Sequence, residues 1–401
     1  MFDFYNSQEK KQRDLYIELL EVTGSLSNLF AESNSPFIYY RAMENIFCKA
    51  FHADNLSRSD ISADAGKDGI GIGLKTFLQG NGKTFQKVAE FNKESYVFDG
   101  LDEMELIQTV AQMRNERINS TMRMCDLDDM IYHLLTRSDG KMSLYEEHMD
   151  LIDLNRIKIL KNSGKTTVHF TDGLHEYNFN KSKSTLLKRF DTRENKKIID
   201  FHVDILEDPF DFLLRAKKQE EVSALPIVAE RSIDEIIYPN RNTEVMDYIV
   251  LPLYSPKDGI VQEKSGLNQW NAGGRKRNPD EVYISVPAWI HQDKQNFFKD
   301  LYNSSDHKTE SFDVRLPNRK TLNMKIAQQG GKALMSNPNK DLGKWILREV
   351  LNLPYDQLAT RDMLDAIGVD SVKLSKLKNG SFVLDFLKAG SYEKFEEENK
   401  N

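Results

Sequence analysis

The sequence predicts an α+β fold, with an N-terminal half of helices and a mixed sheet and a C-terminal half of short strands and a few short helices. Two observations carry this prediction. Near the N-terminus, long segments place apolar residues three and four positions apart, as amphipathic helices do, and glycine-bounded runs follow them. In the last part of the chain, strand-like runs alternate with turn signals. At 401 residues the chain has room for roughly two to three domains.

The N-terminal elements can be placed in order. Helices are predicted where apolar residues recur at helical spacing, and strands where short runs end at glycine. A proline opens the second helix, which suits a first helical turn. The predicted helices are residues 9–30, 36–51, 83–93 and 103–124, and the predicted strands are residues 58–64 and 69–77, joined by a turn at residues 65–68.

The middle of the chain predicts a small antiparallel sheet and then a break. Residues 156–190 contain three strand-like runs separated by turn signals. The runs are RIKIL, TTVHFT and HEYNFN, and the turn signals are SGK and DG. Residues 217–240 carry two prolines and mixed charge without a sustained period, which indicates a connector that a short helix could interrupt. We expect an N-terminal domain at 1–216 with a β-rich subdomain near 126–190, a connector at 217–245 and a C-terminal domain at 246–401.

The C-terminal domain is predicted to be β-rich. Its short apolar runs alternate with polar residues and end at turn signals. Two segments near its end instead have helical spacing. The predicted strands are YIVLPLYS, EVYISVPAWI, FDVRLP, TLNMKIAQ and SFVLDFL, and the predicted short helices are GKWILREVLN and TRDMLDAIG.

Composition excludes several classes of protein. Hydrophobic residues make up 39% of the chain, and no run approaches the roughly 20 apolar residues of a membrane-spanning helix. The start, MFDFYNSQEKKQRD, is charged and lacks the apolar core of a secretory signal, so we expect a cytoplasmic protein without a membrane partner. Cys48 and Cys125 are the two cysteines, and neither lies at zinc-ligand spacing from another Cys or His.

The net charge limits how the chain can meet nucleic acid. Its formal value of −7 argues against a protein that coats nucleic acid indiscriminately, because such binding depends on neutralising phosphates. A sequence-specific binder needs only a local basic surface. Acidic residues elsewhere keep such a protein soluble and suppress wrong contacts.

The second predicted helix carries a carboxylate on an apolar face. Glu44 shares that face with Phe47 and Phe51 by the spacing of three and four residues. Burial of an ionised carboxylate costs several kcal/mol unless a cation receives it, so Glu44 needs a metal ion, a lysine or an arginine. An ordinary ion pair with Arg41 at the helix edge would also meet this need.

Acids and a lysine meet across the predicted hairpin. Strand alternation puts Asp60 and Asp64 on one face, and Lys75 shares a face of the next strand with Gly71 and Gly73. Phosphodiester hydrolysis needs a divalent cation, and oxygen ligands hold Mg²⁺ best. A nearby lysine can stabilise charge at the scissile phosphate. The hairpin therefore predicts a hydrolytic site, although Asp64 could instead cap the turn.

The segment RSDISADAGKDGIGIGLKTF resembles the motif of PD-(D/E)xK nucleases, in which a helix, an aspartate strand and a lysine strand follow in this order. The resemblance implies Mg²⁺ as the cofactor and Asp60 and Asp64 as its ligands. That family has an acid two positions before the lysine, whereas Gly73 stands there in this chain. Either the acid has moved, with Glu90 in the next predicted helix as the candidate, or Glu44 and the aspartates hold the metal without it.

Two C-terminal loops combine amides and basic residues around glycines. Amides and arginines read base edges, whereas lysines fix the register on phosphates. Basic residues that are merely solvated would be the ordinary alternative, and Trp270 could serve packing instead. The candidate DNA-binding residues are Asn268, Trp270, Arg275, Lys276 and Arg277 in the first loop and Gln328, Lys332, Asn337, Asn339 and Lys344 in the second.

These two loops, in SGLNQWNAGGRKRNPDEVYI and QQGGKALMSNPNKDLGKWILREVL, resemble the C-terminal domain of certain restriction endonucleases. That domain is a β-pseudobarrel related to the DNA-binding domain of plant auxin-response transcription factors. The resemblance covers residues 247–395 and implies that two arms of the barrel enter the major groove. Several relatives pair the domain with a metal-independent nuclease of the phospholipase-D type, whose motif has a histidine two positions before a lysine. None of the 8 histidines here has that neighbour.

The residues and the two resemblances together predict a type II restriction endonuclease that cuts double-stranded DNA with magnesium. Its N-terminal domain is expected to hold a restriction-endonuclease-like α/β core. A sequence-specific DNA-binding protein without catalysis, whose N-terminal half dimerises or recruits partners, is the alternative. The oligomeric state stays open, with a homodimer as one option. A cognate DNA methyltransferase is the expected genetic partner.

Overall fold

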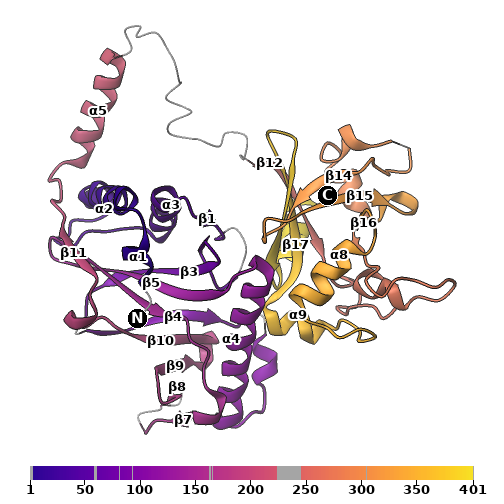
Figure 1. Ribbon diagram of the computed structural model, residues 1–401, viewed down its shortest axis with the longest axis horizontal. Coiled ribbons are helices and arrows are strands. Elements are labelled where there is room, and N and C mark those ends of the chain that lie inside the picture. The colour runs from indigo at the N-terminus through magenta and orange to yellow at the C-terminus, as the bar shows by residue number, and fades with distance from the viewer. Residues whose placement is uncertain are drawn as a thin grey trace. The chain divides into compact units, whose positions relative to one another are not determined.

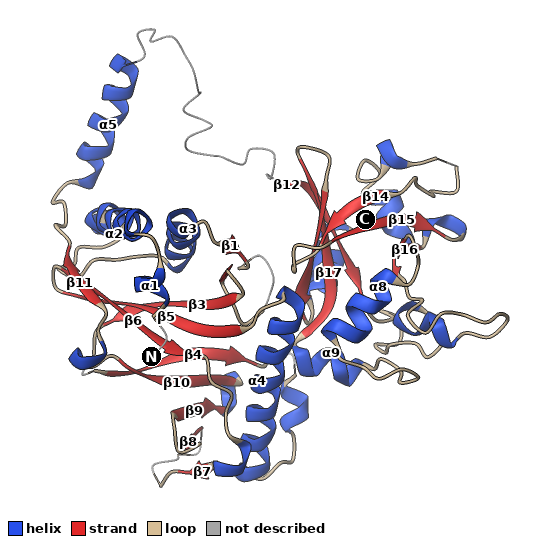
Figure 2. Ribbon diagram, viewed as in Figure 1, coloured by secondary structure: helices blue, strands red, loops and turns tan. Residues whose placement is uncertain are grey.

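A computed structural model describes residues 3–57, 61–80, 82–92, 94–161, 164, 166–223, 245–303 and 305–400 (Figure 1). Contacts divide the chain into two compact units. The first holds Met1–Ser57, Ser62–Arg114 and Leu127–Ile233, and the second holds Arg58–Ile61, Asn115–Asp126 and Asp234–Asn401. The first unit has helices and mixed sheets, and the second a barrel-like sheet with short helices, which confirms the predicted α+β fold (Figure 2).

A mixed sheet of six strands forms the centre of the first unit, in the order β1-β2-β3-β5-β6-β11. β3 and β5 are parallel and the other neighbours antiparallel. The parallel pair needs a long crossover, which contains α4 (Glu103–Cys125), the helix predicted at 103–124. The strands are β1 (Asp54–Asn55), β2 (Ala65–Lys67), β3 (Ile70–Leu78), β5 (Asp129–Ser138), β6 (Lys141–His148) and β11 (Ile199–His202).

Helices cover one face of this sheet (Figure 1). α2 confirms the first predicted helix, and its Tyr16 packs against Phe47 and Phe51 of α3. These rings lie over the apolar side chains of β3, β5 and β6. The elements are α1 (Phe4–Ser7), α2 (Lys10–Ser25), η1 (Ser27–Leu29) and α3 (Tyr40–Phe51).

α3 begins at Tyr40, so the prediction that this helix starts at residue 36 was wrong. Tertiary contacts take the backbone groups that a first helical turn would use. The carbonyl of Pro36 accepts a hydrogen bond from Arg137, and the Phe37 N–H donates to the Ser27 hydroxyl. Tyr39 is extended as a result.

The predicted small antiparallel sheet is confirmed, and it has two strands, β10 and β4, beyond the three predicted runs. Its order is β4-β10-β9-β8-β7, with all pairs antiparallel. Phe190 of β10 packs on Phe77 and Tyr132 of the central sheet, and α4 covers an apolar cluster of the small sheet. The strands are β4 (Lys83–Glu90), β7 (Lys158–Ile159), β8 (Thr167–Thr171), β9 (Glu176–Asn180) and β10 (Thr185–Asp191).

Two local predictions in this unit were wrong. Residues 83–93 were predicted as a helix because Phe85, Val88 and Ala89 have helical spacing, but pairing with β10 makes β4 a strand. The hairpin was predicted to turn at residues 65–68. Residues 65–67 instead form β2, and Asp68 and Gly69 make the two-residue turn, both with positive φ.

The remaining elements of the first unit are short, apart from one helix. The 3-10 helices are η2 (Ser95–Phe98), η3 (Leu154–Arg156), η4 (Lys181–Lys183) and η5 (Glu194–Lys196). α5 (Pro209–Ser223) reaches into the predicted connector at 217–245. Residues 224–244 of that connector lie outside the described residues. In the part of the chain that is described, no helix is both long and apolar enough to cross a membrane.

The second unit is built on a seven-stranded sheet in the order β12-β17-β18-β14-β15-β16-β13. All pairs are antiparallel except β14 with β18. The two end strands, β12 and β13, contact each other, so the barrel is nearly closed. The strands are β12 (Val245–Pro252), β13 (Ile284–Ser285), β14 (Phe312–Arg315), β15 (Thr321–Ala327), β16 (Ala333–Ser336), β17 (Val369–Leu377) and β18 (Phe382–Lys388).

Short helices surround the barrel, as predicted. The segment GKWILREVLN forms the π-helix η10, and TRDMLDAIG forms α9. The EVYISVPAWI segment gives a two-residue strand and then a helix rather than one strand. The helices are η7 (Gly266–Asn271), α7 (Ala288–Asp293), η8 (Lys299–Leu301), η9 (Gln329–Gly331), α8 (Asp341–Gly343), η10 (Lys344–Val350), α9 (Arg361–Ile367) and α10 (Ser391–Asn399).

Candidate functional site

Asp64 lies at the point where the chain enters the central sheet. Its N–H donates to the carbonyl of Ile72 at 2.8 Å, and its carbonyl accepts the N–H of Leu56 at 3.0 Å. Its carboxylate accepts the N–H of Leu74 at 2.7 Å. Backbone groups therefore hold Asp64 on both sides, between the segment after β1 and the strand β3. Its carboxylate is directed back toward β3 rather than into the turn at residues 68–69.

Four charged groups share the surroundings of Asp64. Burial raises the pKa of Asp64, and the positive charge of Lys75 is the largest opposing influence. The negative charge of Glu44 raises the same pKa further, and the positive charge of Arg41 lowers it. The charges of Glu44 on α3 and of Lys75 on β3 therefore both act on Asp64, which lies at the entry to β2.

Glu44 is 4% exposed, on the buried face of α3 as predicted. Arg41 donates to its carboxylate at 2.8 Å and also reaches the carbonyl of Ser57 at 3.2 Å. The ion pair considered from the sequence is present. It does not remove Glu44 from the site, because the Glu44 charge still acts on Asp64.

Gly73 stands where the nuclease family has an acid, and a side chain there would crowd its neighbours. A Cβ on Gly73 would lie 2.7 Å from the Met149 Cε and 3.2 Å from the Tyr132 ring. Tyr132 is the partner of Gly73 in the parallel β3–β5 register, and Arg114 donates to its hydroxyl at 2.8 Å. A buried tyrosine therefore fills the space beside Gly73.

The other two predicted acids differ in position. Glu90 is an exposed residue of β4, where it forms an ion pair with Lys87 at 2.7 Å and accepts a hydrogen bond from Asn92. It belongs to the small sheet, and it is not among the groups whose charges shift the pKa of Asp64. Asp60 lies outside the described residues.

Nearby buried charges have partners of their own. Glu146 accepts hydrogen bonds from the N–H of Tyr5 and bonds His133 at 2.8 Å, and these contacts connect α1 to the sheet. Lys188 is fully buried against Tyr132 and pairs with Glu147. The sequence did not indicate these pairs, because their members come from strands that only the fold brings together.

The first loop of the second unit, between β12 and β13, contains residues of two kinds. Asn268 is fully buried, donates to the carbonyls of Gln262 and Ala359 and accepts the Ala359 N–H, so it holds the loop rather than facing a ligand. Arg277 donates to the carbonyls of Ala272 and Gly273 within its own loop.

The other candidates of this loop are more accessible. Lys276 is exposed, and the exposed Arg275 pairs with the buried Glu281. Trp270 is half-buried. Of the five candidates in this loop, Lys276 and Arg275 are therefore the two that can reach a ligand most directly.

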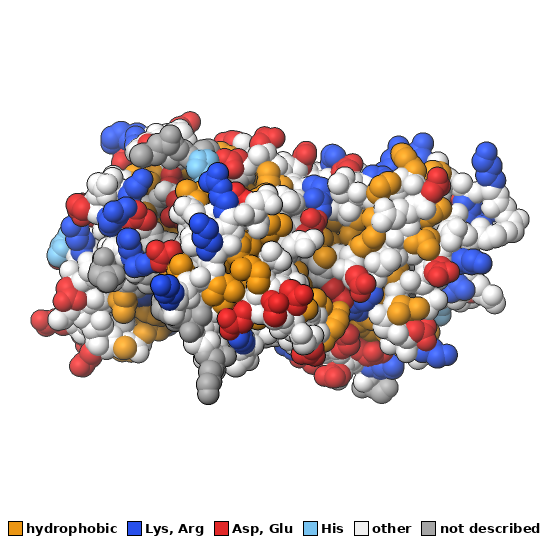
Figure 3. Space-filling model, turned by 90° about the horizontal axis from the view of Figure 1, so that it is seen from below, with side chains coloured by type: hydrophobic (Ala, Val, Ile, Leu, Met, Phe, Trp, Pro, Cys, Tyr) orange, Lys and Arg blue, Asp and Glu red, His pale blue; other side chains and the backbone are white. Residues whose placement is uncertain are grey.

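The second loop presents a more uniform polar surface. Asn337 and Asn339 are exposed after β16, and Lys332 and Lys344 are exposed on either side of them. Gln328 is half-buried and has a positive φ of 65°, at the turn between β15 and β16. Figure 3 shows one face of the molecule, on which basic and acidic side chains are scattered with apolar side chains between them.

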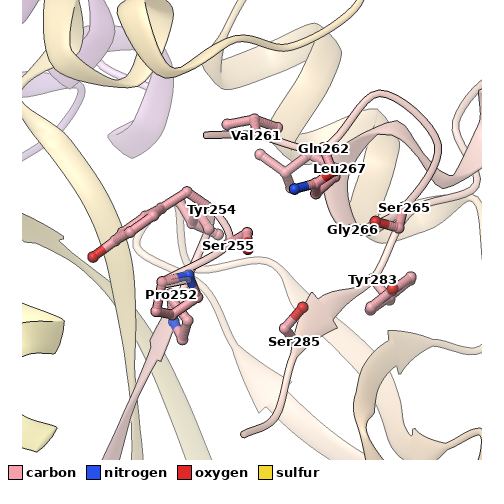
Figure 4. A pocket seen from close by; sticks show the side chains of 12 residues that line it. Pro252, Tyr254, Ser255, Val261, Gln262, Ser265, Gly266, Leu267, Tyr283 and Ser285 are labelled. Atoms are coloured by element: carbon pink, nitrogen blue, oxygen red, sulfur yellow. The ribbon is translucent and has the colours of Figure 1, made fainter. Parts of the chain in front are cut away.

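A pocket of about 210 Å³ opens at the base of the first loop (Figure 4). Tyr254 and Tyr283 lie on opposite sides of it, with Ser255 and Ser285 between them and Ser265 on the side of Tyr283. The hydroxyl of Tyr254 is directed away from the pocket and donates to Glu393 at 2.6 Å.

A nearly closed barrel with long polar loops defines the class of the second unit as a B3-like DNA-binding domain. Residues 243–378 match the family model of the NgoFVII C-terminal B3-like DNA-binding domain, which belongs to a restriction-enzyme family. The match covers about a third of the chain and lies within the second unit. A comparison with curated proteins finds no match.

Proposed function

We propose that the chain is a type II restriction endonuclease, which hydrolyses phosphodiester bonds of double-stranded DNA at a specific sequence with the help of magnesium. One observation carries the proposal. The charges of Glu44 and Lys75, from two other segments of the first unit, both act on the buried Asp64, in a chain whose second unit matches a restriction-enzyme DNA-binding domain. Acids and a lysine in this arrangement suit phosphodiester hydrolysis.

The donor set of this site fits magnesium. Mg²⁺ is commonly held by one or two carboxylates together with waters and substrate phosphate oxygens. Glu44 and Asp64 supply two carboxylates, and burial makes each of them a group that gains from a cation. Among the described residues no group of three His, Cys, Asp or Glu side chains converges, so water and the substrate would complete the shell. When bound, magnesium offsets phosphate charge and makes a bound water more acidic.

Each residue of the site has a proposed role. Asp64 holds the metal in a fixed orientation, because the Leu74 N–H binds its carboxylate. Glu44 is the second ligand, and Arg41 orients it. Lys75 stabilises the charge that develops on the scissile phosphate. Asp60 and Glu90 remain candidate ligands from the sequence, and the surroundings of Asp64 favour Glu44 over Glu90.

The second unit is proposed to select the sequence. Arg275 and the amides Asn337 and Asn339 can pair with base edges, and Lys276 can contact phosphate. The buried Asn268 supports the loop from inside and is removed from the proposed contact set.

The test is a cleavage assay on unmethylated DNA. Plasmid and genomic DNA are incubated with the protein and Mg²⁺, with a chelator as the control, and the fragments are mapped by sequencing their ends. We expect discrete fragments with 5′-phosphate ends only when Mg²⁺ is present. A smear, or intact DNA across genomes of varied sequence, would count against a restriction endonuclease.

A DNA-binding protein without catalysis is the second candidate, and the missing acid at Gly73 favours it. Selection of bound fragments from random DNA separates the two functions. Enrichment of one sequence without metal-dependent cleavage of that sequence would support this candidate. Cleavage of the selected sequence would support the nuclease.

A further inference from the structure

The turn between β15 and β16 has a backbone shape that needs support from outside the turn. Gln328, Gly330 and Gly331 have positive φ angles of 65°, 69° and 65°. A positive φ is costly for a residue with a Cβ, so Gln328 keeps this conformation only where surrounding contacts require it. We call residues 328–331 the β15–β16 turn. It opens the second loop, and the exposed candidate DNA-binding residue Lys332 directly follows it.

Side chains from two other segments bind the backbone of the β15–β16 turn. The Asp306 carboxylate accepts the Gly330 N–H at 2.7 Å. From α7, the Nε2 atom of His291 lies 3.0 Å from the carbonyl oxygen of Gly331. Gly331 is buried, and a Cβ on it would lie 2.7 Å from the His307 carbonyl oxygen and 3.0 Å from the His291 Nε2. The turn thus packs directly against both histidines.

The contacts of His291 indicate which of its ring nitrogens carries the proton. A carbonyl oxygen can only accept a hydrogen bond, so the His291 Nε2 donates to Gly331. Burial raises the pKa of Tyr302, whose hydroxyl therefore keeps its proton and donates to the His291 Nδ1 at 2.9 Å. His291 is 6% exposed. One donor and one acceptor nitrogen are what a neutral imidazole offers, so these contacts fit the neutral ring.

His307 opposes a second proton on the ring of His291. The two rings are stacked, with centroids 4.8 Å apart and planes inclined by 18°. Burial lowers the pKa of His291 from its ordinary value of 6.5, the carbonyl of Gly331 opposes this shift, and the positive charge of His307 lowers the pKa further. Two protonated rings at this distance would repel each other. A gain of protons by the pair therefore works against its contact with the turn.

The other charged groups near the turn are paired or exposed. Lys308 forms an ion pair with Asp306 at 2.8 Å. This lysine, and after it the Gly330 N–H, lowers the pKa of Asp306, so Asp306 stays ionised near neutral pH and in mild acid. Histidine is the side chain that ordinarily changes charge between pH 5 and 8, so His291 and His307 are the groups through which mild acid would act on the turn.

From these contacts we propose that His291 is a positioning residue for DNA binding: its neutral ring, stacked on His307, holds the β15–β16 turn in the shape that binds DNA. The packed arrangement binds a proton less tightly than a released histidine does. Its contribution is therefore complete above pH 6.5 and is lost as the pH falls from 6.5 toward the lowered pKa of His291. The inference rests on the proposed contact of the second loop with DNA, and it does not depend on cleavage.

Hydrogen exchange of the free, full-length protein tests the hold on the turn. Amide exchange at residues 328–331, corrected for its intrinsic dependence on pH, is compared at about pH 7.5 and about pH 5.5. We expect the corrected rate of the wild type to rise by up to about tenfold at the lower pH, because one pH unit changes a protonation equilibrium tenfold. His291→Gln should show no such rise, since its amide can still donate to Gly331 and does not titrate.

Two further variants make this comparison specific. His202→Gln is the matched control, because His202 is an exposed histidine of β11 in the first unit, and this variant should keep the wild-type response. His307→Asn removes the charge from the stack, and asparagine tolerates the positive φ of 56° at this position. Its response to pH should be smaller than that of the wild type. Tryptophan fluorescence during urea unfolding checks that each variant is folded.

DNA affinity is the second measurement. Fluorescence anisotropy uses a labelled duplex that carries the sequence selected from random DNA. The affinity of the wild type should fall by up to about tenfold from about pH 7.5 to about pH 5.5, and that of His291→Gln should stay close to the wild-type value at the higher pH. His291→Ala should lower the affinity at both pH values by at least about fivefold, because it leaves the buried carbonyl of Gly331 without this partner.

The two measurements together distinguish the ways in which the proposal can fail. If exchange at residues 328–331 depended on pH equally in the wild type and in His291→Gln, His291 would not hold the turn. If exchange responded as expected but affinity did not, the turn would not act in DNA binding, and the proposed contact of the second loop would fail with it. A protein that shows both responses without cutting DNA would support this inference and refute only the nuclease proposal.

Discussion

The Asp64 carboxylate accepts the backbone N–H of Leu74 at 2.7 Å, and this bond fixes an acid beside the next residue of β3, Lys75. The Leu74 side chain points into the core beneath α3, so strand alternation sends Lys75 to the opposite face. Asp64 lies at the edge of β3, and charges on both faces of the sheet shift its pKa. Glu44 lies on the side of α3, and Lys75 lies on the opposite side. The hydrogen bond thus fixes the Asp64 carboxylate at the strand edge, between these two charges.

Lys75→Ala should abolish cleavage and leave DNA binding unchanged. The lysine is proposed to stabilise charge that exists only as the phosphodiester bond breaks, so its loss should lower the cleavage rate at least about 100-fold. The measurements are single-turnover cleavage and gel-shift affinity on the same duplex. Lys49→Ala, which removes an exposed lysine at the end of α3, is the control. If the Lys75 variant cut at the wild-type rate, Lys75 would have no part in the chemistry.

Asp64→Asn should stabilise the first unit when no divalent cation is present. Burial raises the pKa of Asp64, so the ionised carboxylate is unfavourable in the folded protein, whereas the amide oxygen can still accept the Leu74 N–H. The expected rise in the melting temperature is a few degrees, about 2–4 °C for each kcal/mol.

Magnesium gives this prediction a second measurement. The wild type should melt at a higher temperature with added Mg²⁺, because a ligand that binds the folded state stabilises it, and the Asp64→Asn variant should not respond. Scanning calorimetry measures the melting temperature of both proteins with and without Mg²⁺. A parallel measurement with Ca²⁺ tests whether another cation that carboxylates bind has the same effect. An equal response to Mg²⁺ in both proteins would remove Asp64 from the metal site.

Glu44→Gln and Glu90→Gln should separate the two acids that could replace the one missing at Gly73. The negative charge of Glu44, on α3, raises the pKa of Asp64, whereas Glu90 forms an ion pair with Lys87 on the small sheet. We expect a loss of cleavage of at least about 100-fold for Glu44→Gln and wild-type cleavage for Glu90→Gln. The reverse result would mean that the sequence interpretation of Glu90 was right and that Glu44 only pairs with Arg41.

Periodicity was enough to predict the helix that carries Glu44, because the burial of its side chains repeats with the helical period over several turns. The same reasoning failed at residues 83–93, where an apolar spacing typical of a helix lies in a strand that pairs with a segment about a hundred residues away. Asp64 and Lys75 were selected from a hairpin whose turn was misplaced, and their role stays a prediction. The role of Tyr132 beside Gly73 could not be predicted, since it depends on the parallel register of β3 and β5.

Lys276 and Arg277 should respond differently to exchange between lysine and arginine, although they are neighbours. Lys276 is exposed, so Lys276→Arg should keep DNA affinity, and Lys276→Ala should lower the slope of log affinity against log salt by about one. Arg277 binds loop carbonyls with its guanidinium, so Arg277→Lys should weaken binding even though the charge is kept. Fluorescence anisotropy with a labelled duplex across salt concentrations measures both effects. Equal behaviour of Lys276→Arg and Arg277→Lys would contradict the structural role of Arg277.

Asp370 should make the stability of the second unit depend on pH. It is fully buried on β17, where it pairs with Arg361 at 2.8 Å and accepts the N–H of Gly390. Burial nevertheless raises its pKa from the ordinary value of 3.8 for an aspartate to about 6. Because the folded state holds the proton more tightly than the unfolded state, the stability contributed by protonation is complete below about pH 4 and is lost as the pH rises through 6.

Asp370→Asn removes this dependence. As the pH rises from 4 to 7, the unfolding free energy of the variant should therefore increase relative to that of the wild type. The change is at most about 3 kcal/mol, since one pKa unit corresponds to about 1.4 kcal/mol. The loss of the ion pair with Arg361 adds a constant amount to this free-energy difference at every pH. The change of the difference with pH therefore reports the titration of Asp370 alone. The three tryptophans, Trp270, Trp289 and Trp345, all belong to the second unit, so their fluorescence during urea unfolding reports on this unit. A difference that stays constant between pH 4 and pH 7 would mean that Asp370 is ionised throughout, with Arg361 compensating its burial in full.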